Sequence, residues 1–184
     1  MEEKNWLGTD LALDETQLGA DLSSSSRGDI DQISDEMNLA QAILHRLRTI
    51  RGELADIGHP NYGSDLYDLI GEPNNQSTRD RVKNLVRATI RDEPRVKEIV
   101  KVEVRSRLEL LDKKRGGQYP RSAQTLHEAK TGAEGNDHIH GSKSSSYEED
   151  RRALATSVDV DITIIPINSN VPLNIVFPFY LEVS

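Results

Sequence analysis

The chain has 184 residues, no cysteine and a formal net charge of −8 at pH 7. This length suits one domain with residues to spare, and the absence of thiols excludes disulfides, thiolate metal sites and a cysteine nucleophile. No apolar run approaches the ~20 residues that cross a bilayer, and no charged-then-apolar leader opens the chain. We therefore expect a protein of the cytoplasm, without membrane insertion.

Charge is distributed unevenly along the chain. Residues 1–40 carry ten acidic and two basic residues, whereas residues 79–115 carry thirteen basic and seven acidic ones. An acidic protein without an aromatic-studded basic stripe is a poor candidate for binding nucleic acid. The acidic first segment is either a solvated surface or a contact for a basic surface, on this chain or on a partner.

The first expected helix runs from about residue 32 to residue 57. Its apolar residues recur at steps of three and four, acidic residues cluster at its start, and Gly58 and Pro60 follow its end. The residues expected on its apolar face are Ile30, Ile33, Met37, Ala40, Leu44, Leu47, Ile50, Leu54 and Ile57.

Two more helices are expected before residue 95. A short one follows Ser64 as its N-cap, and a longer one begins at Ser77 or Thr78 and ends before Pro94. The inward residues of the longer helix are expected to be Val82, Leu85, Val86, Thr89 and Ile90.

After Pro94 the apolar period changes from 3.6 residues to two, which is typical of strands. Valines alternate with charged residues over 100–105, and apolar residues alternate with polar ones over 157–164. Antiparallel pairing of these two strands places aspartates of the second opposite bases of the first. The four residues concerned are Asp159, Asp161, Lys101 and Arg105.

A last strand is expected over residues 173–183, and a further short strand over residues 6–13. Pro172 and Pro178 predict that the last strand is bulged or lies at a sheet edge, because proline cannot donate to a ladder. The predicted fold is α+β, with three helices packed on a small antiparallel sheet.

Residues 112–153 are rich in Gly, Ser, His and charge. Because so long a polar stretch is uncommon inside a compact domain, we predict a mobile insertion over residues 106–155, at the tip of a β-hairpin. The predicted organisation is an acidic segment over residues 1–27 and a single domain over residues 28–184.

The order of these motifs resembles the GPW family of baseplate wedge proteins of contractile phage tails, type VI secretion systems and related injection particles. The resemblance covers about residues 28–105 and, more loosely, the last strand. The motifs that carry it are Arg51-Gly52-Glu53, Pro60-Asn61-Tyr62-Gly63-Ser64-Asp65-Leu66, Glu93-Pro94-Arg95-Val96 and Phe177-Pro178-Phe179-Tyr180-Leu181-Glu182.

The resemblance implies a structural subunit that links larger baseplate wedge subunits to the first sheath ring in a sixfold assembly. It implies assembly in the cytoplasm, followed by incorporation into the baseplate. Glu93, Pro94 and Arg95 are the implied wedge contact. The implied sheath contact lies on edge strands around residues 156–183, at Val158, Val160, Ile162, Phe177, Phe179 and Tyr180.

From the residues alone, other interpretations stay open. Glu93 and Arg95 can simply close a helix and form a surface ion pair. The same domain can also serve as a free-standing regulator or adaptor that binds one partner.

A lysozyme-like hydrolase needs two carboxylates ~5–10 Å apart across a sugar-binding cleft. Glu53 and Asp56 are neighbours on the predicted first helix, but aromatic residues for stacking a sugar are few. We therefore expect no enzymatic activity.

One group of residues has the composition of a metal site. Asp137, His138 and His140 lie close together in sequence, with His127 upstream. A zinc site also needs rigid ligands and supporting hydrogen bonds, which a Gly/Ser-rich segment does not supply. A solvated loop is the favoured interpretation, so no metal or cofactor is expected.

Overall fold

The computed structural model describes residues 6–16, 19–114 and 153–181. It combines helices with antiparallel sheets, so the predicted α+β class is confirmed. In chain order, the elements are β1 (Thr9–Leu11), β2 (Leu13–Thr16), β3 (Gly19–Leu22), β4 (Gln32–Ser34), α1 (Asp35–Arg48), the 3₁₀ turns η1 (Ala55–Ile57) and η2 (Leu66–Leu69), α2 (Gln76–Arg91), β5 (Val96–Ser106), α3 (Arg107–Lys114), β6 (Ser157–Pro166) and β7 (Leu173–Tyr180).

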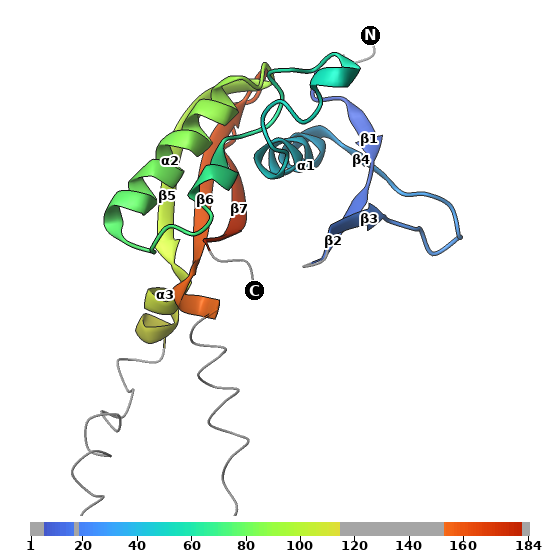
Figure 1. Cartoon of the computed structure of the whole chain (residues 1–184). Coiled ribbons are helices and arrows are strands. Elements are labelled where there is room, and N and C mark those ends of the chain that lie inside the picture. The colour runs from blue at the N-terminus through green and yellow to red at the C-terminus, as the bar shows by residue number, and fades with distance from the viewer. Residues whose placement is uncertain (1–5, 17–18, 115–152, 182–184) are drawn as a thin grey trace, which may run out of the picture.

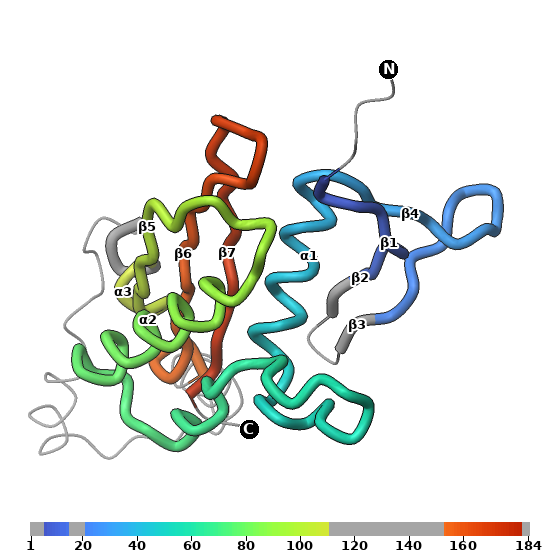
Figure 2. The backbone as a smooth tube through the Cα atoms, turned by 90° about the horizontal axis from the view of Figure 1, so that it is seen from above, coloured from blue at the N-terminus to red at the C-terminus, as the bar shows by residue number. Residues whose placement is uncertain are grey.

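The central sheet has three antiparallel strands in the order β5-β6-β7. Figures 1 and 2 show α2 against this sheet and α1 beside β7. Alternate residues of β6 and β7 point into a shared core with both helices. The core includes Leu39, Ile43, Leu47, Val82, Val86, Ile90, Val102, Val158, Val160, Ile162, Ile164, Ile175, Phe177 and Phe179.

α2 follows its sequence prediction closely. The side chain of Asn75 accepts a hydrogen bond from the Thr78 backbone N–H, so Asn75 rather than Ser77 or Thr78 caps the helix. The predicted inward residues are buried or, for Leu85, partly buried.

α1 ends at Arg48, nine residues before the predicted end. Thr49 leaves the helical conformation, and its hydroxyl donates to the His45 carbonyl. Ile50 then forms a parallel bridge with Ser64, and this tertiary pairing replaces the continued helix. The predicted apolar face is also wrong in part: Met37 is 62% exposed, because the face that enters the core carries Leu39, Ile43 and Leu47.

β5 carries two irregularities that the alternation of valines did not predict. The register slips by one residue between Val96 and Glu98 and again between Ile99 and Lys101. Val100 is the extra residue of the second bulge and is 48% exposed, whereas Val102 is buried. The bulge therefore removes Val100 from the apolar face that we expected it to share with Val102 and Val104.

The charged face of the sheet departs from the predicted pairing. Asp159 lies opposite Arg105 as expected, but Asp161 lies opposite Glu103. Lys101 and Arg105 flank Glu103, and their positive charges compensate the repulsion between the Glu103 and Asp161 carboxylates. Lys101 Nζ lies 2.7 Å from the Glu103 carboxylate. Hydrogen bonds from Lys101 and Arg105 lower the pKa of the Glu103 carboxyl.

The first part of the described chain forms a narrow β-ribbon that extends from α1, away from the central sheet (Figure 1). β1 pairs with β4, and β2 pairs with β3, both antiparallel. A short strand was expected within residues 6–13. The structure has two strands in this region, β1 over Thr9–Leu11 and β2 over Leu13–Thr16. Because β1 pairs with β4, strand pairing joins both sides of the predicted boundary between residues 27 and 28, and the division itself stays a prediction.

The connection from β5 to β6 joins an antiparallel pair, with Ser106 opposite Val158. α3 begins this connection. Most of the predicted insertion over residues 106–155 lies outside the described residues. Across the described ranges, no helix is long and apolar enough to cross a membrane.

Gly63 provides a test of how the segment after α1 is fixed. Its φ is +106°, and a Cβ there would lie 2.7 Å from the Thr49 carbonyl oxygen. We expect Gly63→Ala to lower the free energy of unfolding by at least about 2 kcal/mol, because strain and overlap act together. Chemical denaturation of the purified protein measures this loss.

Gly58 is the matched control, since its φ is +95° but a Cβ added there would meet nothing within 4 Å. Gly58→Ala carries only the backbone strain, about 1–2 kcal/mol. Equal losses for the two variants would contradict the close approach of Gly63 to the end of α1.

Candidate functional site

Glu93 is a buried carboxylate at the turn between α2 and β5. Its side chain is 5% exposed, its backbone N–H donates to the Ile90 carbonyl, and its own carbonyl accepts from Val96. The turn that closes α2 therefore directs Glu93 inward, whereas Pro94 beside it is exposed.

Two arginines share the Glu93 carboxylate. Arg95 Nε donates to Oε1 at 2.6 Å, and Arg46 Nη2 lies 3.6 Å from Oε2. The Arg95 backbone N–H also points at Oε1, at 3.4 Å. A buried carboxylate is tolerated only when it is paired and hydrogen-bonded, and here α1 and the β5 end of the turn each supply a cation.

Arg46 also contacts an aromatic ring. Its guanidinium carbon lies 4.7 Å from the centre of the Tyr62 ring, a cation–π distance. Burial raises the pKa of the Tyr62 phenol, and the charge of Arg46 opposes this. A groove of about 510 Å³ lies beside the pair, with Arg51, Asp92 and residues 58–62 on its walls.

Arg95 reaches the N-terminal segment as well. Its Nη1 donates to the Leu7 carbonyl at 3.1 Å, and the buried Asn38 Nδ2 donates to the same oxygen at 2.8 Å. The Glu93–Arg95 pair thus joins the end of α2, α1 and the start of the ribbon at one point.

The predicted sheath-contact residues lie in very different environments. Val158, Val160 and Ile162 are completely buried on β6, which is paired on both sides and has no free edge. Phe177 and Phe179 are 3% and 7% exposed and stack with ring centres 6.3 Å apart. Of the six, only Tyr180 is exposed, at 43%. The five buried side chains build the core, and β7 is an outer strand of the sheet as the described residues form it.

The two edges of the central sheet differ in character. β5 carries two bulges and the charged residues Lys97, Glu98, Lys101, Glu103 and Arg105. β7 pairs with β6 in an unbroken register over eight residues and carries no charged side chain. Bulges and charges protect an edge against a further strand, so the residues of β5 carry this protection and those of β7 do not, although α1 lies beside β7.

A family model for contractile injection system sheath initiators matches residues 9–110, more than half of the chain. The chain belongs to this family. The match confirms the kind of protein that the sequence motifs indicated, a component of contractile injection systems. It covers the ribbon, both long helices and β5, while β6 and β7 lie beyond it.

The sheath initiator is also similar to a solved structure from Geobacter sulfurreducens, described as a candidate tail lysozyme. The two chains share 23% identity, the match covers 83% of this chain and 96% of that chain, and the TM-score is 0.49. At these values the likeness carries no functional argument. A search of curated proteins found no significant match.

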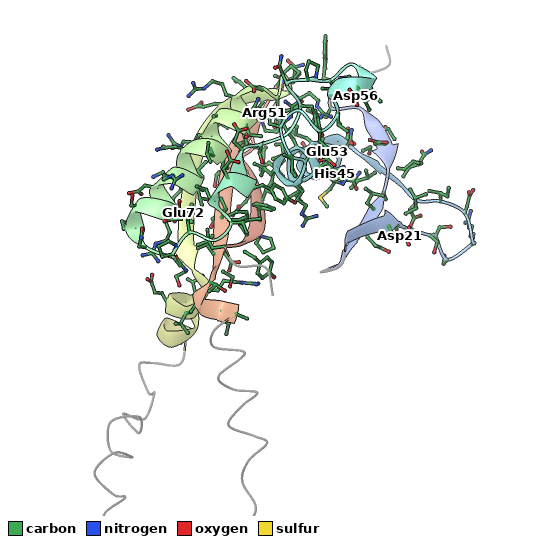
Figure 3. The ribbon with its side chains drawn as sticks, viewed as in Figure 1. Asp21, His45, Arg51, Glu53, Asp56 and Glu72 are labelled. Atoms are coloured by element: carbon green, nitrogen blue, oxygen red, sulfur yellow. The ribbon has the colours of Figure 1, made fainter. Side chains whose placement is uncertain are left out.

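The carboxylates considered for hydrolysis do not share a helix. Glu53 lies in a turn and Asp56 in η1, and Figure 3 shows both on the segment that follows α1. Glu53 Oε2 accepts a hydrogen bond from the Ile50 backbone N–H, which is a local structural role. Sheath initiators are a structural family, which argues against catalysis.

The histidine group considered for metal binding, His127, His138 and His140, lies outside the described residues. Within the described ranges, no group of three or more His, Asp or Glu residues is placed to hold a metal ion.

Sequence reasoning missed the residues that support Glu93. Arg46 and Asn38 lie on α1, and Leu7 lies at the start of the described chain, 88 positions from Arg95. No periodic pattern pointed to them: Asn38 and Gln41 lie three positions apart on the side of α1 that faces away from Leu39, Ile43 and Leu47, and the N-terminal segment covers that side through hydrogen bonds to both side chains.

Replacing the Glu93 carboxylate tests its role in this sheath initiator. Glu93→Gln keeps the shape but leaves two arginines without their shared counter-charge, so we expect a loss of about 2–4 kcal/mol in the free energy of unfolding. Glu109→Gln is the control, because Glu109 pairs with Arg79 at 3.0 Å while 66% exposed, and we expect a loss below about 1 kcal/mol. Similar losses for the two variants, measured by urea unfolding, would contradict a special role for Glu93.

Proposed function

We propose that this sheath initiator is a structural baseplate wedge subunit that connects larger wedge subunits to the first sheath ring and starts sheath assembly. The observation that carries the proposal is the asymmetry of the central sheet, with a protected β5 edge and an uncharged, unbulged β7 edge. A polymer that grows from a fixed start needs a template, and a free strand edge is one.

The orientation of β7 suits strand addition. Pro178 has no N–H, so it fits in β7 only where its nitrogen points away from β6. Residues two apart in an antiparallel strand share that orientation. Val176 and Tyr180 therefore direct their backbone groups to the free edge, and both side chains are exposed, at 58% and 43%.

The wedge contact is proposed at Glu93, Pro94 and Arg95. Pro94 is exposed and Arg95 retains 24% exposure, so the turn is accessible although Glu93 is not. The implied partners are larger wedge subunits on this side and the sheath protein along β7, in a sixfold ring. We further propose that assembly takes place in the cytoplasm, that no nucleic acid or catalytic step is involved, and that residues 106–155 form an insertion within one domain.

Backbone docking at β7 is tested by removing an edge N–H. Val176→Pro deletes a second outward donor beside Pro178, and the preceding Ile175 is already extended as proline requires. We expect the purified variant to stay folded and the baseplates that contain it to lack sheath. Electron micrographs of particles assembled with the variant give the fraction that carries sheath.

Val176→Ala is the matched control, since it removes the side chain but keeps the N–H. We expect sheathed particles at the wild-type level. Sheath on Val176→Pro baseplates would exclude strand addition at β7. Loss of sheath in both variants would show that the side chain, and not the backbone, makes the contact.

A further inference from the structure

One flank of α2 carries a row of basic residues. Arg79, Lys83, Arg87 and Arg91 follow one another at intervals of four, so they lie along the same side of the helix. Over its whole length α2 has five basic residues and one acidic residue, a net charge of +4. Within the row, Arg79 alone has an ion-pair partner among the described residues, Glu109 at 3.0 Å. Like charges four positions apart repel each other, so the basic row is unfavourable in the isolated helix.

The basic row borders a groove between α2 and β5. The groove has a volume of about 330 Å³, and its walls carry the basic Arg79, Lys83 and Arg105 and the acidic Asp80 and Glu103. Glu103 already binds the two bases that flank it on β5. The groove and the basic row together form the α2–β5 surface, on which an acidic segment can lie.

The ribbon has the opposite charge. Its described residues, 9–16 and 19–34, hold six acidic residues and one basic residue, a net charge of −5. Asp14 and Asp21 are exposed and lie directly opposite each other in the pairing of β2 with β3, where like charges destabilise a strand pair. On the central sheet, two flanking bases compensate the same arrangement of Glu103 and Asp161. No ion pair from the described part of the chain reaches Asp14 or Asp21.

The two charged surfaces lie on opposite sides of the molecule. Figure 2 shows α1 between the ribbon and the α2–β5 surface, and Figure 1 shows the same separation from another side. The ribbon therefore does not neutralise the basic row of its own chain. An acidic surface on one side and a basic surface on the other suit a head-to-tail contact between identical copies, and such contacts repeat until they close a ring.

We propose that the ribbon of each copy docks on the α2–β5 surface of the neighbouring copy, so that sheath initiators are joined head to tail around the baseplate. The inference rests on the proposed function, because it needs the ring. It adds a third contact to the wedge contact at the Glu93-Pro94-Arg95 turn and the sheath contact at β7. Exposed ion pairs are individually weak and are screened by salt, so the contact forms where the wedge subunits hold neighbouring copies side by side.

The cysteine-free sequence allows a direct test by cross-linking. Ser24→Cys places a thiol on the ribbon and Asn84→Cys places one on α2, both at exposed, uncharged positions. In baseplates assembled with the larger wedge subunits, a short thiol-reactive cross-linker should join copies of the double variant into a ladder of oligomers. Each single variant should stay monomeric, because a head-to-tail contact brings a ribbon to a helix and never two ribbons or two helices together.

Charge reversal tests whether opposite charges make the contact. In the double-cysteine background, Asp14→Lys with Asp21→Lys should lower the cross-linked fraction per incorporated copy about tenfold, because like charges then face each other. Lys83→Glu with Arg87→Glu should lower it as strongly. All four reversals together should restore the ladder, and this restoration also shows that the reversed chains fold.

Asp56→Lys with Asp68→Lys is the control, since it reverses two exposed acids outside both surfaces and should leave the ladder unchanged. Sheathed baseplates without a ladder would overturn the inference and leave the proposed function intact. A ladder that reversal does not weaken, or that the four reversals together do not restore, would also overturn it. Absence of the wild-type protein from assembled baseplates would overturn both the inference and the proposed function.

Discussion

The Glu93 carboxylate is the interaction on which the arrangement of the parts depends. It is buried at the turn between α2 and β5, and it binds Arg46 of α1 and Arg95 at the start of β5. Arg95 in turn holds the Leu7 carbonyl at the start of the ribbon. A buried charge of this kind is costly unless its partners are in place, so an arrangement that moves Arg46 or Arg95 away from Glu93 is disfavoured.

The central sheet adds a second constraint, which concerns the addition of a further strand at its edges and not the packing inside the subunit. β6 is saturated by its two neighbours, and β5 is twisted by bulges and lined with charge. Of the two outer strands, β7 alone combines an unbroken register with uncharged side chains. If β7 accepts a sheath strand as proposed, the protected β5 edge would keep the subunit from polymerising with itself through both edges.

Periodic patterns predicted the elements whose packing is local and regular. The alternation over 157–164 and the helical pattern over 76–91 indicated the correct buried faces, and proline placed β7 at an edge. Apolar steps of three and four continued past Arg48, but the pairing of Ile50 with Ser64 ended the helix. The contact of Arg95 with Leu7 was not predictable, because no pattern links a guanidinium to a carbonyl 88 positions away.

A density map of the assembled baseplate with its first sheath ring tests these proposals most directly. We expect a sheath strand hydrogen-bonded along β7 and the turn of Glu93, Pro94 and Arg95 against a larger wedge subunit. A β7 edge that faces solvent in the assembled particle, or a Glu93-Pro94-Arg95 turn that touches no wedge subunit, would contradict them.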